Sequence, residues 1–336
     1  MEARSAPNPH GPAGAKARIW APGRGGEGGL SVDGLVLCIG GATVDRLYRA
    51  ADELVPGTSN PVVSSRAFGG VARNVAETLA RLGTPVALVS VVGADENGRA
   101  IRDHLAVLGV DVGFLREIPG ARTAEYVAVT GPSGDLAFGL ADMAILDRLG
   151  PGTVEDARCA TAALMVMDCN LPASTLREFL ARRRAGHGPP VAVDAVSVAK
   201  VMRLPKQLGG VDVLFLNLDE ARAALGATLP AEDAVGALLA RGARAVVLTR
   251  GPSGLLVADE RGVEAMPAVP VGAVADVTGA GDALVGATAM GLARGEDLRV
   301  ALRAGLAAAA LALERPGGVR PDLGPALLAA GIKQMP

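Results

Sequence analysis

The chain has 336 residues, of which 33 are basic and 35 acidic, so its formal net charge is −2. The sequence has no block of Lys and Arg and no basic stripe interleaved with aromatic residues, which argues against a nucleic-acid partner. Hydrophobic residues make up 50% of the chain and aromatic residues only 2%, so Val, Leu and Ala must fill the core. Such a core suits a parallel sheet that is covered by helices on both faces.

Cysteine and histidine are both rare in this sequence. Cys38, Cys159 and Cys169 are scattered, and the three histidines lie far apart. This usage predicts neither a disulfide framework nor a zinc site, and it favours a reducing compartment. The sequence also shows no apolar run of about 18 residues and no charged-then-apolar leader. We therefore expect a cytoplasmic protein without a membrane partner.

Residues 1–30 are rich in Gly and Pro and lack a periodic apolar pattern, which predicts a disordered tail. A single folded domain is expected over residues 31–330. In chain order, the apolar patterns predict a strand at 35–39, a helix at 71–82, a strand at 86–92, a helix at 99–108, a strand at 163–167, a helix at 174–184, strands at 190–193, 213–216 and 245–249, and helices at 280–293 and 298–313.

Strands that alternate with helices imply right-handed crossovers and a mostly parallel sheet. Hairpin-type segments near residues 45–68 and 123–139 interrupt this alternation. The second of them contains the turn sequence Gly131-Pro132-Ser133-Gly134. We expect both segments to form a separate small sheet, a lid in functional terms, so the predicted fold class is α/β with a mostly parallel central sheet and a small β lid.

The most informative stretch is the small-residue turn Gly279-Ala280-Gly281, which leads directly into an apolar helix and is followed by Asp282. Free backbone N–H groups at a helix start bind anions, and glycines let an anion approach the backbone closely. A carboxylate beside an anion site fits a base that accepts a proton from a hydroxyl attacking phosphorus. The alternative is that Asp282 only interacts with the helix dipole and that the glycines serve packing.

A second group of candidate residues lies upstream. Gly69 and Gly70 open a helix that carries Asn74 one turn in, and Asp45 follows the first predicted strand. A ligand lies at the carboxyl ends of strands in open α/β sheets, where a carboxylate and an amide can bind sugar hydroxyls. A double glycine before a helix is common, so a purely structural role stays open for this pair.

Three segments together resemble the ribokinase-like (PfkB) carbohydrate kinases: Gly69-Gly70 with Asn74, residues 92–98, and residues 276–282. The resemblance runs from about residue 35 to about residue 321. It implies a three-layer α/β/α sandwich and an ATP-dependent kinase in which Asp282 is the general base. In this resemblance, the backbone amides of Gly279, Ala280 and Gly281 form the anion hole, and Asp45, Gly69, Gly70 and Asn74 bind the sugar hydroxyls.

The resemblance also implies sites for ATP and metal ions. Asn217 and Glu220 match a motif that holds Mg²⁺ through water, and the alternative for this pair is a helix cap followed by an acidic first turn. Further residues expected on the ATP side are Thr249, Gly251, Gly254 and Thr278. Asp276, together with Thr278, matches positions that bind a monovalent cation such as K⁺. No Gly-x-Gly-x-x-Gly follows the first strand and no Gly-Lys-Ser/Thr occurs, so Rossmann and P-loop alternatives are disfavoured.

Finer features resemble the branch of this family that phosphorylates the ribose 5′-hydroxyl of the nucleoside pseudouridine. Val71 stands where a ribokinase usually has Lys, and Asn170 where a carboxylate would be expected, which disfavours free ribose. The residues expected near the base are Ser59, Asn60, Asp142 and Asn170, although a plain turn or surface role remains open for Asn60 and Asp142.

Two other functions were weighed beside this one. The alternatives are a kinase for another acceptor (ribose, adenosine or a ketose) and a catalytically silent nucleoside-binding regulatory protein. Relatives in this family often pair through their lid sheets, so we expect a homodimer.

Overall fold

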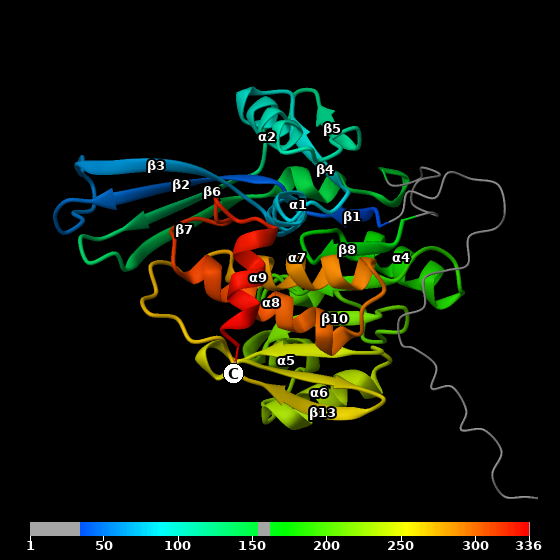
Figure 1. Ribbon diagram of the computed structural model, residues 1–336. Helices are drawn as coiled ribbons and strands as arrows, with labels where there is room; N and C mark the ends of the chain where they lie inside the picture. The colour runs from blue at the N-terminus through cyan, green and yellow to red at the C-terminus, as the bar shows by residue number, and fades with distance from the viewer. Residues whose placement is uncertain (1–33, 154–161, 336) are drawn as a thin grey trace, which may run out of the picture.

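Two sheets organise the computed structural model, which describes residues 34–153 and 162–335. The tail predicted over residues 1–30 and the thiol of Cys159 lie outside the described residues. In the described part of the chain, nine strands form one large sheet in the order β13-β12-β11-β10-β9-β8-β1-β4-β5 (Figure 1). Its strands are β1 (Val36–Ile39), β4 (Val86–Gly93), β5 (Leu115–Ile118), β8 (Leu164–Asp168), β9 (Val191–Asp194), β10 (Val213–Asn217), β11 (Val246–Thr249), β12 (Leu255–Asp259) and β13 (Gly262–Met266).

The large sheet is parallel from β5 to β11, and only the pairs β11–β12 and β12–β13 are antiparallel. Parallel strands leave their carboxyl ends at one edge, where the sequence has polar residues after several strands. The predicted mostly parallel sheet is therefore confirmed.

Helices cover both faces of this sheet, and alternate side chains of each strand enter two separate apolar cores. In β10, for example, Val213 and Phe215 pack in one core and Leu214 and Leu216 in the other. The first core is closed by α1 (Val71–Arg81), α2 (Glu96–Val107), α7 (Ala280–Ala293), α8 (Leu298–Leu313) and α9 (Pro325–Lys333), and the second by α4 (Ala173–Arg184), α5 (Leu218–Leu225) and α6 (Ala231–Ala240). This arrangement is the predicted three-layer sandwich.

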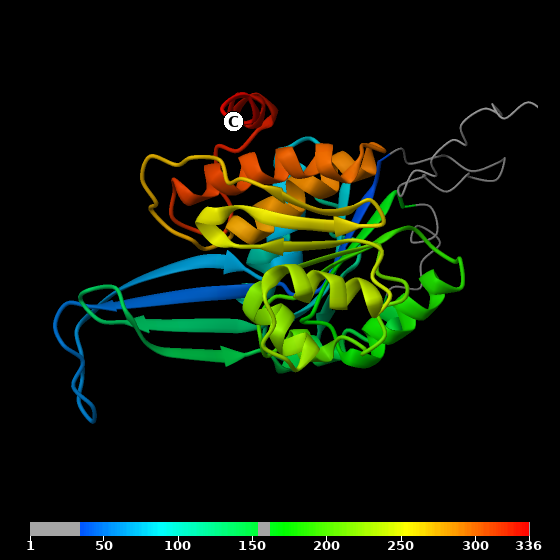
Figure 2. The ribbon, with the colours of Figure 1, turned by 90° about the horizontal axis from the view of Figure 1, so that it is seen from below.

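A second sheet projects from the sandwich as a long ribbon (Figures 1 and 2). It contains β2 (Thr43–Ala50), β3 (Val62–Gly69), β6 (Glu125–Thr130) and β7 (Leu136–Asp142) in the order β3-β2-β6-β7. The pair β2–β6 is parallel and the other two pairs are antiparallel. Val44 is fully buried at the root of this sheet, whereas Phe138 near the outer end of β7 is 57% exposed.

Several helices and strands were not predicted from the sequence: β5, β12, β13, α6 and α9. The start of α5 was anticipated only as the helix-cap alternative for Asn217 and Glu220. The helix predicted at 99–108 begins three residues earlier, because the Asp95 side chain accepts a hydrogen bond from the Gly98 amide and caps α2. The boundaries predicted for α7 and α8 agree with the structure.

Candidate active site

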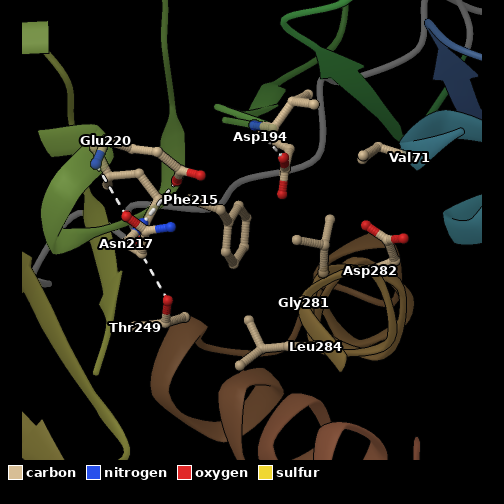
Figure 3. Close-up of a pocket in the computed structure, with 12 residues that line it drawn as sticks. Val71, Asp194, Phe215, Asn217, Glu220, Thr249, Gly281, Asp282 and Leu284 are labelled. Carbon is tan, nitrogen blue, oxygen red and sulfur yellow. Dashed lines mark hydrogen bonds between the residues drawn. The ribbon is translucent and has the colours of Figure 1, made fainter. Parts of the chain in front are cut away.

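A cavity of about 150 Å³ opens where the carboxyl ends of β9, β10 and β11 face the first turn of α7 (Figure 3). Five residues predicted from the sequence line it: Asn217, Glu220, Thr249, Gly281 and Asp282. They come from three separate stretches of the chain. The parallel topology brings them together, as expected for the carboxyl edge of such a sheet.

Asp282 is the third residue of α7, and its carboxylate lies at the cavity wall (Figure 3). The Asn74 side-chain amide donates a hydrogen bond of 2.6 Å to Asp282 Oδ2. Burial raises the pKa of Asp282 to about 6, while the Asn74 hydrogen bond and the Arg73 charge act in the opposite direction. A carboxylate with this pKa is ionised at neutral pH and still basic enough to accept a proton.

The first turn of α7 is open toward the cavity. Gly279 is its N-terminal cap with φ of 76°, and no side chain caps the helix. A Cβ at Gly279 would collide with the carbonyl oxygen of Gly318, so only glycine fits at this position. Gly281 lines the cavity itself. The first backbone N–H groups of a helix lack helical partners. Of these amides, that of Ala280 makes only a long hydrogen bond of 3.5 Å to the Val277 carbonyl, so the turn can still donate to an anion beside Asp282.

Asn217 and Glu220 form a complete capping box at the start of α5. The Glu220 amide donates to Asn217 Oδ1 at 2.9 Å, and the Asn217 amide donates to Glu220 Oε2 at 2.8 Å. The helix-capping alternative for this pair is therefore confirmed. Both side chains also line the cavity, so the capping role and a ligand role are compatible.

Two carboxylates share the cavity wall on this side, Glu220 and Asp194. Burial raises the pKa of Glu220, and burial followed by the charges of Asp282 and Glu220 raises that of Asp194 well above its usual range. Among the described residues, no group of three or more His, Cys, Asp or Glu is arranged to hold a metal ion. This donor set fits a hydrated Mg²⁺, which binds through one or two carboxylates and keeps its waters or phosphate oxygens as other ligands.

The predicted sugar-binding glycines contact other parts of the chain closely. A Cβ at Gly69 would collide with the Asp45 carboxylate, and a Cβ at Gly70, where φ is 90°, would collide with the Gly41 carbonyl. Asp45 accepts a hydrogen bond of 2.9 Å from Thr43, and burial raises its pKa. Asp45, Gly69 and Gly70 therefore meet at the root of the small sheet.

Asn170 lies near the same root, next to the buried carboxylate of Asp168. Asp168 accepts three backbone hydrogen bonds, from Gly41 (2.8 Å), Ala72 (2.9 Å) and Asn170 (2.8 Å). These bonds fix the N-terminal end of α1 against the loop after β1. Asp168 thus stabilises the backbone on which Asn74 is placed.

The remaining predicted residues on the ATP side lie outside the cavity. Gly251 begins a short 3₁₀ turn, and Gly254 with φ of 80° packs against the backbone of Met266. Asp276 accepts hydrogen bonds from the amides of Thr278 (2.9 Å) and Gly317 (3.1 Å). Burial alone would raise the pKa of Asp276, but these bonds outweigh it and lower the pKa.

None of the four residues predicted near the base (Ser59, Asn60, Asp142 and Asn170) lines the cavity. Ser59 and Asn60 lie in the loop that joins the outer ends of β2 and β3, about 17 Å or more along the sheet from Asp45. The Asn60 side chain closes that loop through hydrogen bonds to the amide (2.8 Å) and carbonyl (3.0 Å) of Val55. Asp142 is exposed at the inner end of β7.

Several residues that line the cavity were not predicted from the sequence, among them Asp194, Val196 and Phe215. Asp194 ends β9, so the argument applied to Asp45, that a carboxylate after a strand faces a ligand, could have found it. Val196 has φ of 67°, which is rare for a β-branched residue and marks local strain beside the cavity. Phe215 carries no signal in the sequence that separates it from other core residues.

Comparisons with known proteins agree with this fold. The model of the pfkB family carbohydrate kinases matches residues 33–323. The pseudouridine kinase of Escherichia coli (strain K12) is 28% identical over 294 residues, covering 86% of this chain and 93% of that protein. A 1-phosphofructokinase of Rhodobacter capsulatus is 31% identical and covers 84% of this chain and 92% of that protein. A carbohydrate kinase structure from Agrobacterium tumefaciens is 31% identical, with a TM-score of 0.77 over 90% of this chain and 98% of that one.

The family match and the relatives identify a kinase that transfers phosphate from ATP to a sugar or a nucleoside. The chain belongs to the pfkB family of carbohydrate kinases. Membership implies the use of ATP and of a divalent metal ion. Within residues 34–153 and 162–335, none of the helices combines the length and apolar character that a membrane span requires.

Proposed function

We propose that this protein transfers the γ-phosphate of ATP to the ribose 5′-hydroxyl of pseudouridine, giving pseudouridine 5′-phosphate. The observation that carries the proposal is the pairing of Asp282 with the uncapped first turn of α7 at one cavity. A general base and a set of anion donors are the two parts that phosphoryl transfer needs from the protein.

In this reaction Asp282 acts as the general base. Its ionised carboxylate accepts the proton of the 5′-hydroxyl as the hydroxyl oxygen forms a bond to the γ-phosphorus and the bond from that phosphorus to the β–γ bridging oxygen breaks. Asn74 holds the carboxylate in position through its hydrogen bond to Oδ2. The amides of Gly279, Ala280 and Gly281 stabilise the charge on the transferring phosphate.

The substrates are placed on either side of Asp282. Asp45, Gly69, Gly70 and Asn74 contact the ribose hydroxyls at the root of the small sheet, with Asn170 and Asp142 nearest to the base. On the other side ATP contacts Thr249, with Gly251, Gly254 and Thr278 around the nucleotide. Ser59 and Asn60 reach the base only if the small sheet bends or a second subunit supplies them.

Metal ions are assigned to two positions. Asn217 and Glu220 would hold Mg²⁺ through water beside the phosphates, and Asp276 with Thr278 would hold K⁺. Bound there, Mg²⁺ supplies neutralisation of the phosphate charge. The first assignment is supported by the two side chains of the capping box, both of which line the cavity and carry oxygen atoms.

Pseudouridine is favoured over other acceptors by the residues at the site and by the relatives. Val71 lines the cavity with an aliphatic side chain, and Asn170 offers an amide that can both donate and accept. The relative from E. coli is named a pseudouridine kinase. The similarity to a 1-phosphofructokinase keeps a sugar acceptor as the second candidate.

We propose that residues 31–330 form one kinase domain and that the small sheet, over residues 45–68 and 123–139, is a lid through which two chains pair. Leu136, Phe138 and Leu140 of the edge strand β7 are 57–58% exposed, which is a costly arrangement for an isolated chain. Sedimentation should give a dimer, and Phe138→Lys should weaken it.

We also place the protein in the cytoplasm, where the buried, unpaired thiols of Cys38 and Cys169 stay reduced.

A panel assay tests the substrate assignment. Purified protein is incubated with ATP, Mg²⁺ and each of pseudouridine, uridine, adenosine, ribose and fructose 6-phosphate, and the phosphorylated product is measured. We expect the highest kcat/KM with pseudouridine. A higher value for a hexose phosphate or for ribose would reject this acceptor, and saturable binding of pseudouridine without phosphate transfer would favour the silent binding protein.

A further inference from the structure

The guanidinium of Arg73 is buried at the junction of α1 with the small sheet. Arg73 is 2% exposed. Its Nε donates to the carbonyl of Gly69 (3.2 Å) and its Nη2 to the carbonyl of Phe68 (2.8 Å), the last two residues of β3. One side chain therefore ties the end of the small sheet to the helix that carries Asn74.

The charge of Arg73 is only partly neutralised by its ion-pair partner. Arg73 pairs with Glu77, one turn further along α1. The same Glu77 carboxylate also pairs with Arg81 (2.6 Å) and lies 3.0 Å from His104 Nε2 on α2. Since two arginines and a histidine share one carboxylate, positive charge remains on the Arg73 side, toward the carboxylates of the site.

Carboxylates face Asp282 from several elements: Asp45 on β2, Asp168 at the end of β8 and Asp194 at the end of β9. Each of them disfavours the ionised form of Asp282. Arg73 is the cation that acts most strongly on Asp282, and it also acts on Asp45. The buried positive charge of Arg73 thus acts on two of the carboxylates of the site, Asp45 and Asp282.

We propose that Arg73 is a positioning residue for phosphoryl transfer, which keeps Asp282 ionised and holds Asn74 and the end of β3 in register with it. This inference rests on the proposed role of Asp282 as general base. The two hydrogen bonds from the Arg73 guanidinium to the carbonyls of Phe68 and Gly69, here called the fork, align the substrate-facing end of β3. The positive charge of Arg73 offsets the negative charge of the nearby carboxylates. A lysine could supply the charge but cannot make both carbonyl bonds and the ion pair together.

Three variants separate these two contributions. Arg73→Met removes both the positive charge and the hydrogen bonds to the two carbonyls. Glu77 is not left without a partner, because Arg81 and His104 still contact it. Arg73→Lys keeps the charge alone. Arg81→Met is the matched control, because it takes an arginine from the same Glu77 on the side away from the site, where Arg81 contacts Pro321 instead of β3. Circular dichroism and thermal unfolding establish that each variant is folded.

The readouts are the pH dependence of kcat/KM and the KM for the acceptor, measured with whichever acceptor the wild-type protein phosphorylates best. For Arg73→Met we expect the acid limb to move up by about one pH unit. For Arg73→Lys we expect the limb to stay in place while the acceptor KM rises about tenfold. Arg81→Met should change neither.

An unchanged acid limb in folded Arg73→Met, or an equal shift in Arg81→Met, would overturn the proposal. If Arg73→Met does not fold, Arg73→Lys decides, since a wild-type KM in that variant contradicts the role of the fork. The proposed function fails separately, through wild-type protein that phosphorylates no acceptor or through Asp282→Asn with near-normal turnover.

Discussion

Two helix starts face the same cavity and differ in how their backbone donors are satisfied. At α5, Asn217 and Glu220 close a capping box, so the first amides are occupied by the chain's own side chains. At α7, Gly279 begins the helix without any side-chain cap. One cavity can therefore bind groups of opposite charge. The open start of α7 offers backbone donors to an anion, and the capped start of α5 holds the Glu220 carboxylate at the cavity wall, where it can attract a cation.

The largest effect is expected from the residue that distinguishes the open start. Asp282→Asn keeps the shape of the side chain but removes the base, so kcat should fall at least ~10²-fold. Because burial raises the pKa of Asp282 to about 6, the folded protein binds a proton more tightly than the unfolded chain. The charge of Asp282 therefore destabilises the wild-type fold above pH 6, and the variant should unfold at a higher temperature than wild type at pH 8.

Thermal unfolding at pH 4 and pH 8 checks this sign. The gain in stability of Asp282→Asn should shrink toward pH 4, where Asp282 is protonated in the folded protein. Equal kcat in the variant and wild type would remove Asp282 as the general base.

The geometry of the open start can be tested through Gly279. Gly279→Ala places a Cβ against the Gly318 carbonyl at a positive φ, which should cost at least about 2 kcal/mol in the free energy of unfolding and lower kcat. The matched control is Gly226→Ala, at the C-terminal end of α5, where φ is 67° and no atom lies within 4 Å of the added Cβ. That variant should lose only about 1 kcal/mol and keep its kcat. Urea unfolding and steady-state kinetics distinguish them, and equal losses would mean that the contact with Gly318 is unimportant.

At the capped start, charge and capping can be separated. Glu220→Gln keeps an oxygen that accepts from the Asn217 amide but removes the negative charge, so we expect the Mg²⁺ concentration for half-maximal rate to rise about tenfold, equivalent to about 1.4 kcal/mol, with little change in stability. Asp219→Asn makes the same charge change on a side chain that is 77% exposed and outside the cavity, so it should leave the Mg²⁺ dependence unchanged. An equal Mg²⁺ dependence in Glu220→Gln and wild type would leave only the capping role for Glu220.

The smallest effect is expected from Asn217→Ala, which breaks the capping box and should cost about 1 kcal/mol in the free energy of unfolding. Denaturant titration measures this loss. A stability equal to that of wild type would show that the capping bonds are replaced by water at no cost.

The sequence predicted those parts of the fold that have clear start and stop signals. Helices α7 and α8 are long and apolar and begin after Gly279 and Asp297, and their bounds were predicted correctly. In contrast, α6 begins after Pro230 without a side-chain cap and is rich in Ala, and β13 is an exposed edge strand, so neither has a strong pattern. Local signals cannot reveal an element that depends on its neighbours for stability.

The same limit applies to the site. Asp282 was found because it follows a small-residue turn at a helix start, whereas Asn217 and Thr249 were found because their segments resemble motifs of the family. The partner of Asp282, Asn74, lies 208 positions away, and only the packing of α1 against α7 brings the two together. Arg73 has no pattern of its own in the sequence, because its importance depends on carbonyls and carboxylates that the fold assembles around it.

The acid limb of wild-type kcat/KM tests the role of Asp282 most directly. With saturating ATP and Mg²⁺, kcat/KM for pseudouridine should be constant above about pH 7 and should fall tenfold per pH unit below about 6, because the proton then occupies the base. A profile that stays flat down to pH 4.5 would contradict the assignment of this carboxylate as the group that accepts the hydroxyl proton.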